Sequence, residues 1–208
     1  LIAAMRQVDD IPDVAVMMDC DPYEDVDWPE NWKIHASIEH LELQRAWNTL
    51  FSLYPSEKTY GLLTDHARPR SKWSEILEKT AGNWQIAYCK DNHERTNPRT
   101  GNRRIPAASC MGGELVRTMG YVWPDFCTHM YGDDALEEIG NELGLSTICE
   151  TAEVDDLLSK KGQFPIDSNN NRMRNGKPYV REDAIAYMDW SLHVKPSLID
   201  KLKHAINA

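Results

Sequence analysis

The stretch YGLLTDHARP, residues 60–69, indicates most directly how this chain should fold. Its first half is mostly apolar and stops at Asp65, as a buried strand does at the edge of a sheet. His66 follows the acid, and Arg68-Pro69 predict a turn. A carboxylate beside an imidazole at a strand end suits a transition metal such as manganese, or a general base. The alternative is that Asp65 caps the turn and His66 faces solvent.

Expected strands and helices alternate on both sides of this stretch. Apolar runs predict strands at 14–21, 32–37, 60–65, 84–91 and 145–150, and helical spacing predicts helices at 40–54, 71–82, 108–121, 127–144 and 181–208. Helices that connect short apolar strands favour an α/β fold with a mostly parallel central sheet. We therefore expect helices on both faces of the sheet and a C-terminal helical extension.

Composition limits the kind of partner and the compartment. The chain has 208 residues and a formal net charge of -10, which argues against gripping nucleic acid by broad phosphate neutralisation. Its five cysteines are widely spaced and odd in number, so we expect a reducing compartment, the cytoplasm, or the host cytoplasm for a viral protein. No apolar run approaches the roughly 20 residues that span a bilayer, so no membrane span is expected.

Acidic residues follow several of the expected strands. In parallel α/β sheets, ligands bind outside the carboxyl ends of the strands, where Asp19, Asp21, Asp65 and Asp91 should lie. Asp19 and Asp21 occupy alternate positions, so both could reach one base, ribose hydroxyl or metal. The alternative is that Asp-Pro at 21–22 simply terminates the strand.

Two motifs stand at expected helix starts. MYGDD, residues 130–134, brings Asp133 and Asp134 to the beginning of a helix, where a general base could take the proton of an acceptor hydroxyl. Helix starts also favour carboxylates without any catalytic role. In SCMGGEL, Gly112 and Gly113 let the backbone approach an anion, or form a tight turn.

The order of these motifs resembles that of small GT-A glycosyltransferases found in phage and bacterial genomes. RAWN, 45–48, is similar to their A-x-N segment, and 60–69 stands where the family has its strand-end D-x-D or D-D motif. CMGGELVRTMGY, 110–121, resembles the segment ahead of the acceptor site. HMYGDDALEEIGNELG, 129–144, resembles the helix that supplies the catalytic acid. The resemblance covers about residues 11 to 150.

The resemblance implies a single Rossmann-like GT-A domain, with its core at 1–150 and a C-terminal loop and helices at 151–208 packed on that core. It implies transfer of a sugar from a nucleoside-diphosphate donor to a hydroxyl on a glycan, small molecule, protein or modified nucleic acid. The residues implied in donor binding are Asp19, Asp21, Asn48, Asp65, Arg68, Gly112 and Gly113, and Asp134 or Asp133 is implied as the catalytic base.

A divalent cation, manganese or magnesium, is implied as well. Its ligands would be Asp65, His66 and Asp156, with His66 in the place of the family's second acid and Asp156 in that of its late histidine. The family's first strand would precede Leu1. Two alternatives remain open: a sugar-nucleotide nucleotidyltransferase, and a non-catalytic protein that binds a nucleotide or sugar.

Overall fold

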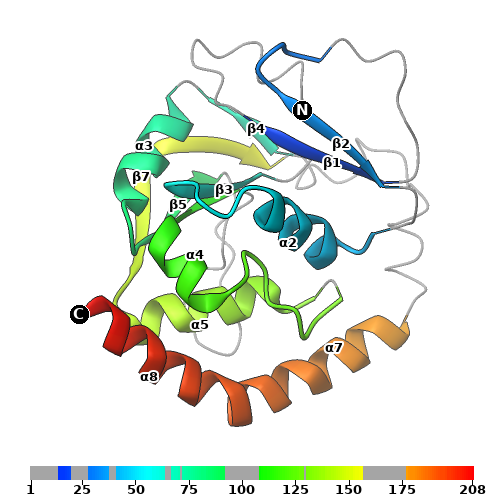
Figure 1. Ribbon diagram of the computed structural model, residues 1–208, viewed down its shortest axis with the longest axis vertical. Helices are drawn as coiled ribbons and strands as arrows, with labels where there is room; N and C mark the ends of the chain where they lie inside the picture. The colour runs from blue at the N-terminus through cyan, green and yellow to red at the C-terminus, as the bar shows by residue number, and fades with distance from the viewer. Residues whose placement is uncertain are drawn as a thin grey trace.

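The computed structural model describes residues 14–19, 28–37, 41–63, 67–70, 72–91, 108–128, 130–156 and 177–208. Its strands are β1 (Ala15–Asp19), β2 (Lys33–Ser37), β3 (Thr59–Leu63), β4 (Ala67–Pro69), β5 (Ile86–Asp91), β6 (Ala108–Gly112) and β7 (Ser146–Asp156). Its helices are α2 (Leu43–Leu53), α3 (Trp73–Ala81), α4 (Gly113–Met119), α5 (Gly132–Leu143), α7 (Lys177–Asp189) and α8 (Lys195–Ile206), with a π-helical segment, η2 (Trp190–Val194), between the last two. Figure 1 shows how these elements are arranged.

The main sheet is mixed, so the expected mostly parallel, Rossmann-like sheet is wrong. Five strands lie in the order β3-β6-β5-β7-β4, and only β5 and β7 pair in parallel. The prediction failed because it missed two strands. Residues 108–112 were expected to begin a helix but form β6, which pairs antiparallel with both β3 and β5. Arg68-Pro69 was expected to be a turn, but residues 67–69 form β4, antiparallel to β7.

The other two strands form a small sheet of their own. β1 and β2 pair in parallel, with Ala15 opposite Lys33. Val16 and Ile34 pack against the apolar cluster that contains Ala67 of β4. The pair therefore lies beside the β4 side of the main sheet (Figure 1).

The main sheet must curl. Its edge strands β3 and β4 are consecutive in the chain, and only three residues separate Leu63 from Ala67. Four residue steps span at most about 14 Å. In a flat sheet, four strand spacings would put these edges about 19 Å apart. The sheet therefore bends until β3 and β4 approach each other, in a nearly closed, barrel-like arrangement.

Two local features allow this curvature. Along the β5–β7 pair, Cys149 lies opposite Cys89 but Glu153 lies opposite the next residue, Lys90, so β7 carries extra residues that bend it. The face under α3 carries small side chains, so the helix can approach closely and contact β3, β5, β6 and β7. The small buried residues on this face are Ala67, Ala87, Cys89, Ala108, Cys110, Cys149 and Ala152.

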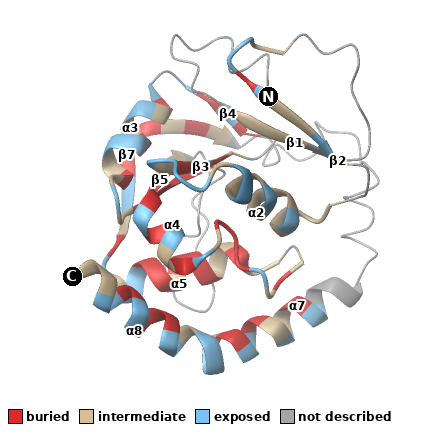
Figure 2. Cartoon of the chain, viewed as in Figure 1, coloured by how far each residue is buried: buried red, intermediate tan, exposed pale blue. Residues whose placement is uncertain are grey.

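The opposite face carries larger apolar residues and the main core. Because side chains alternate along a strand, Ile86 and Tyr88 point away from Ala87 and Cys89. They pack with α4, α5 and the C-terminal helices, whose Tyr187, Trp190, Leu198, Ile199 and Leu202 are all buried in the same cluster. Figure 2 shows this burial along the inner side of α7 and α8. The C-terminal helices thus complete the core.

Gly113 lies where a side chain has no room. A Cβ there would lie 2.4 Å from the carbonyl oxygen of Glu57 and 2.7 Å from that of Lys58. We expect Gly113→Ala to lower the free energy of unfolding by about 3 kcal/mol, because this clash exceeds the roughly 1 kcal/mol that alanine gains over glycine in a helix. Urea unfolding followed by tryptophan fluorescence measures the loss.

Gly61→Ala is the matched control, because its Cβ would meet nothing closer than the carbonyl oxygen of Ser109 at 3.9 Å. We expect it to change the free energy of unfolding by no more than about 0.5 kcal/mol. Equal losses in the two variants would contradict the close approach at Gly113.

Candidate active site at one end of the sheet

Strand directions bring two acidic residues, Asp91 and Asp156, to the same end of the main sheet. β3, β5 and β7 run one way, and β4 and β6 run the other way. The last residues of the first three and the first residues of the other two therefore lie together: Leu63, Asp91, Asp156, Ala67 and Ala108. We call this group of positions the acidic end of the sheet.

Of the predicted metal ligands, the structure describes the backbone of Asp156, which lies at this end. Asp65 and His66 lie outside the described residues, but Leu63 and Ala67 on either side of them are at the acidic end. Ala67 pairs with Asp156 across the β4–β7 ladder. His66 precedes Ala67 by one residue in the sequence. The register thus places Asp156 opposite the residue that follows the Asp-His pair.

Arg68 of β4 and Arg70, the residue after that strand, lie opposite acidic residues of β7. The Arg70 guanidinium is 3.0 Å from a carboxylate oxygen of Asp155 and 3.6 Å from one of Glu153. Arg68 is exposed and pairs in register with Asp155. Guanidinium groups at this position could meet the oxygens of a diphosphate.

The two acids predicted on the first strand are only partly covered by the structure. Asp19 is the last residue of β1 and pairs with Ser37 of β2. Asp21 lies outside the described residues. Both remain predictions as donor-binding residues.

Asn48 holds a loop in place. From α2, its Oδ1 accepts hydrogen bonds from the backbone N–H groups of Val122 (3.0 Å) and Trp123 (3.1 Å). Its Nδ2 donates to the carbonyl oxygen of Trp123 at 2.8 Å. It also borders a shallow polar depression with Gln44, Arg45, Thr49, Ser52 and Asp125. The amide that was expected to bind a donor is thus engaged by the chain itself.

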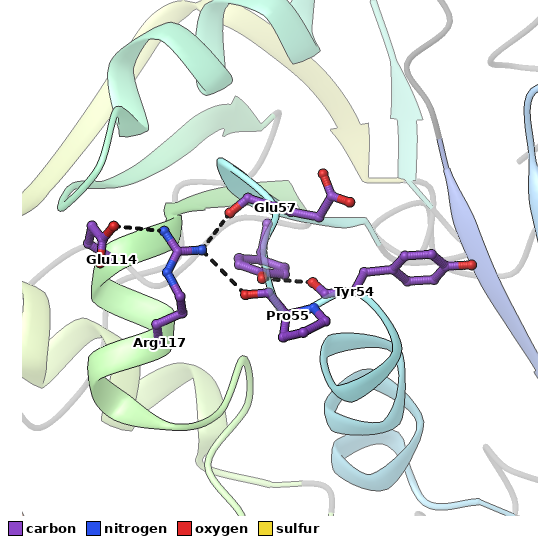
Figure 3. A network of polar contacts seen from close by, with 6 residues as sticks. Tyr54, Pro55, Glu57, Glu114 and Arg117 are labelled. Atoms are coloured by element: carbon purple, nitrogen blue, oxygen red, sulfur yellow. Dashed lines mark hydrogen bonds and ion pairs between the residues drawn. The ribbon is translucent and has the colours of Figure 1, made fainter.

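Gly112 and Gly113 lie at the other end of the sheet. Gly112 ends β6 opposite Thr59, the first residue of β3. The backbone N–H of Gly113 donates to the carbonyl oxygen of Lys58 at 2.8 Å. The same loop is held by Arg117 of α4, which donates to the carbonyl oxygen of Glu57 at 2.8 Å (Figure 3). Close packing therefore explains both glycines, and the structure does not bring them to the acidic end.

Asp133 and Asp134 lie in the first turn of α5 and are half-buried. Burial raises the pKa of the Tyr88 phenol on β5, and the negative charges of Glu137 and Asp133 add to this rise. Asp133 is therefore close enough to the middle strand of the sheet to act on it electrostatically. This is the side of the sheet that α5 covers.

Asp183, a buried acid that contacts Thr128 and Met130 before α5, was not predicted from the sequence. Its carboxylate accepts hydrogen bonds from the backbone N–H groups of Thr128 and Met130. A signal was available: Asp183, Tyr187 and Trp190 recur at helical spacing, and an acid on an otherwise apolar helix face calls for a partner.

Within the described parts of the chain, no group of three or more His, Cys, Asp or Glu side chains is arranged to hold a metal ion. The predicted ligands Asp65 and His66 are not among those residues. None of the helices in the described ranges is both long and apolar enough to cross a bilayer.

We expect Asn48→Ala to lower the free energy of unfolding by about 3 kcal/mol, because it leaves two buried N–H groups without their acceptor. Asn48→Asp keeps that acceptor and should cost about half as much. Thr49→Ala, at the exposed neighbouring position, is the control and should change stability by less than about 0.5 kcal/mol. Urea unfolding ranks the three variants; an Asn48→Ala loss no larger than that of the control would contradict the account of Asn48.

No protein-family model matches this chain, and the curated proteins searched contain no match to it.

Proposed function

We propose that this chain is a glycosyltransferase that moves a sugar from a nucleoside-diphosphate donor to an acceptor hydroxyl at the acidic end of the sheet. The observation that supports this most is the pairing of β4 with β7, in which Asp156 lies opposite Ala67. Ala67 is the residue that follows Asp65 and His66 in the sequence. The predicted ligands thus come from two parts of the chain that are far apart in the sequence: Asp65 and His66 just before β4, and Asp156 as the last residue of β7. Carboxylate and imidazole ligands suit manganese, and carboxylates suit magnesium.

In this proposal the arginines and a bound cation would stabilise the leaving group. Breaking the bond between the sugar and the diphosphate leaves negative charge on the diphosphate, and a divalent cation held by Asp65, His66 and Asp156 would stabilise that charge. Arg68 is exposed at the acidic end and could add a second positive charge. Asp155 is paired with Arg70, and Asp156 is the acid predicted as a cation ligand.

The acceptor side of the reaction is assigned to α5. Asp134 or Asp133 would take the proton of the acceptor hydroxyl as the sugar is transferred. Both lie in the first turn of a helix packed on the sheet, which fixes their backbone. The β1–β2 pair lies beside β4. Asp19, the last residue of β1, could contact the nucleoside.

We expect Asp65→Ala to reduce donor hydrolysis by at least about 100-fold, because the growing charge on the diphosphate loses its cation. The measurement is release of nucleoside diphosphate from a panel of nucleotide sugars with manganese present. Asp200→Ala, at an exposed position of α8, is the matched control and should hydrolyse the donor like the wild type. Turnover retained in Asp65→Ala would contradict the assignment.

We expect Asp134→Asn or Asp133→Asn to separate the two halves of the reaction. Loss of a general base should lower transfer to the acceptor by about 100-fold or more, whereas the affinity for the donor should not change. The transfer rate and the donor Kd are measured on the same samples. An unchanged transfer rate in both variants would show that neither Asp133 nor Asp134 is the general base. Donor binding without turnover in the wild type would indicate a non-catalytic binding protein instead.

A further inference from the structure

Asp183 of α7 is a buried carboxylate that binds the chain just before α5. Its Oδ1 accepts a hydrogen bond from the backbone N–H of Thr128 at 2.9 Å, and its Oδ2 accepts one from that of Met130 at 2.8 Å. The side chain is only 3% exposed. Removing a carboxylate from water is costly unless hydrogen bonds compensate, and bonds to a charged acceptor are the stronger kind. The contact therefore links α7 specifically to this segment.

Through Tyr187, α7 also contacts Tyr131 and Glu138. The Tyr187 ring stacks on the Tyr131 ring, with centroids 5.2 Å apart and planes at 18°. Its hydroxyl donates to a carboxylate oxygen of Glu138, and Lys195 lies 3.0 Å from the other oxygen. Tyr131 has a φ of 67°, a left-handed conformation that a non-glycine residue keeps only when its surroundings hold it. Contacts from α7 and α8 supply part of those surroundings.

The contact made by Asp183 lies next to the acids of α5 in the sequence. Met130 precedes Asp133 by three residues, so the path of this short segment sets where the first turn of the helix begins. Burial raises the pKa of the Cys127 thiol to about 12, with further contributions from the negative charges of Asp183 and Asp133. Both carboxylates therefore lie within electrostatic range of the same sulfur. Asp183 and the proposed base Asp133 therefore belong to one local structure.

We infer that Asp183 is a positioning residue, which holds the backbone at Thr128 and Met130 and thereby fixes the orientation of Asp133 and Asp134. Its effect on catalysis rests on the proposed function, whereas its effect on the segment does not. Helix α7 thus has a role beyond completing the core: it sets the geometry of the start of α5.

The test compares Asp183→Asn with Tyr187→Phe. Asparagine keeps the size of the side chain but replaces one acceptor oxygen with an NH₂ group, whereas phenylalanine removes the contact with Glu138 and keeps the ring. We expect Asp183→Asn to speed hydrogen exchange at the amides of Thr128 and Met130 at least 10-fold. It should also lower kcat for transfer at least 10-fold with an unchanged KM for the donor. Tyr187→Phe should leave both the exchange rates and kcat close to those of the wild type.

Unchanged exchange at both amides in Asp183→Asn would overturn the inference. So would a fall in kcat that Tyr187→Phe reproduces at an equal loss of thermal stability, because a general loosening of the fold would then explain it. If the wild type turned over no donor, the proposed function would fail, and amide exchange would still decide whether Asp183 holds the segment.

Discussion

The short connection between β3 and β4 constrains this fold more than any other feature. These strands form opposite edges of a five-stranded sheet, yet only three residues join them. The sheet can satisfy that connection only by curling, and the bend of β7 and the small side chains under α3 make the curl possible. Curling brings the ends of β3 and β7 and the start of β4 together. The acidic end of the sheet is therefore a consequence of the topology.

The sequence predicted the elements whose signal is local. Apolar runs located β1, β3 and β5, and helical spacing located α2, α3 and α5, because those patterns depend on near neighbours. It missed β6, where Ala-Ser-Cys-Met-Gly has no β-branched residue, and β4, where Ala-Arg-Pro is too short to show alternation. Both strands are defined by partners distant in the sequence. Their absence from the prediction is why the sheet was expected to be mostly parallel.

The same difference between local and distant signals applies to the site. Acids after apolar strands are a local pattern, and the structure places Asp91 and Asp156 at one end of the sheet. Asn48 was predicted to bind a donor because RAWN resembles a family segment, and Gly113 because a glycine pair precedes a helix. Their contacts are with Trp123 and Lys58, which no local pattern indicates. Asp183 went unnoticed because its partner amides lie more than 50 residues earlier. Polar residues that fix loops and polar residues that bind ligands look alike in a sequence.

The central claim is that the acidic end of the sheet binds a nucleoside diphosphate together with a divalent cation. Thermal-shift titration of the purified chain against nucleoside diphosphates, each with and without manganese, tests it most directly. The account predicts a rise in Tm that needs both nucleotide and metal, of about 5 °C or more at roughly 100 times the Kd. A well-folded sample whose Tm responds to no nucleotide, with or without manganese, would contradict it.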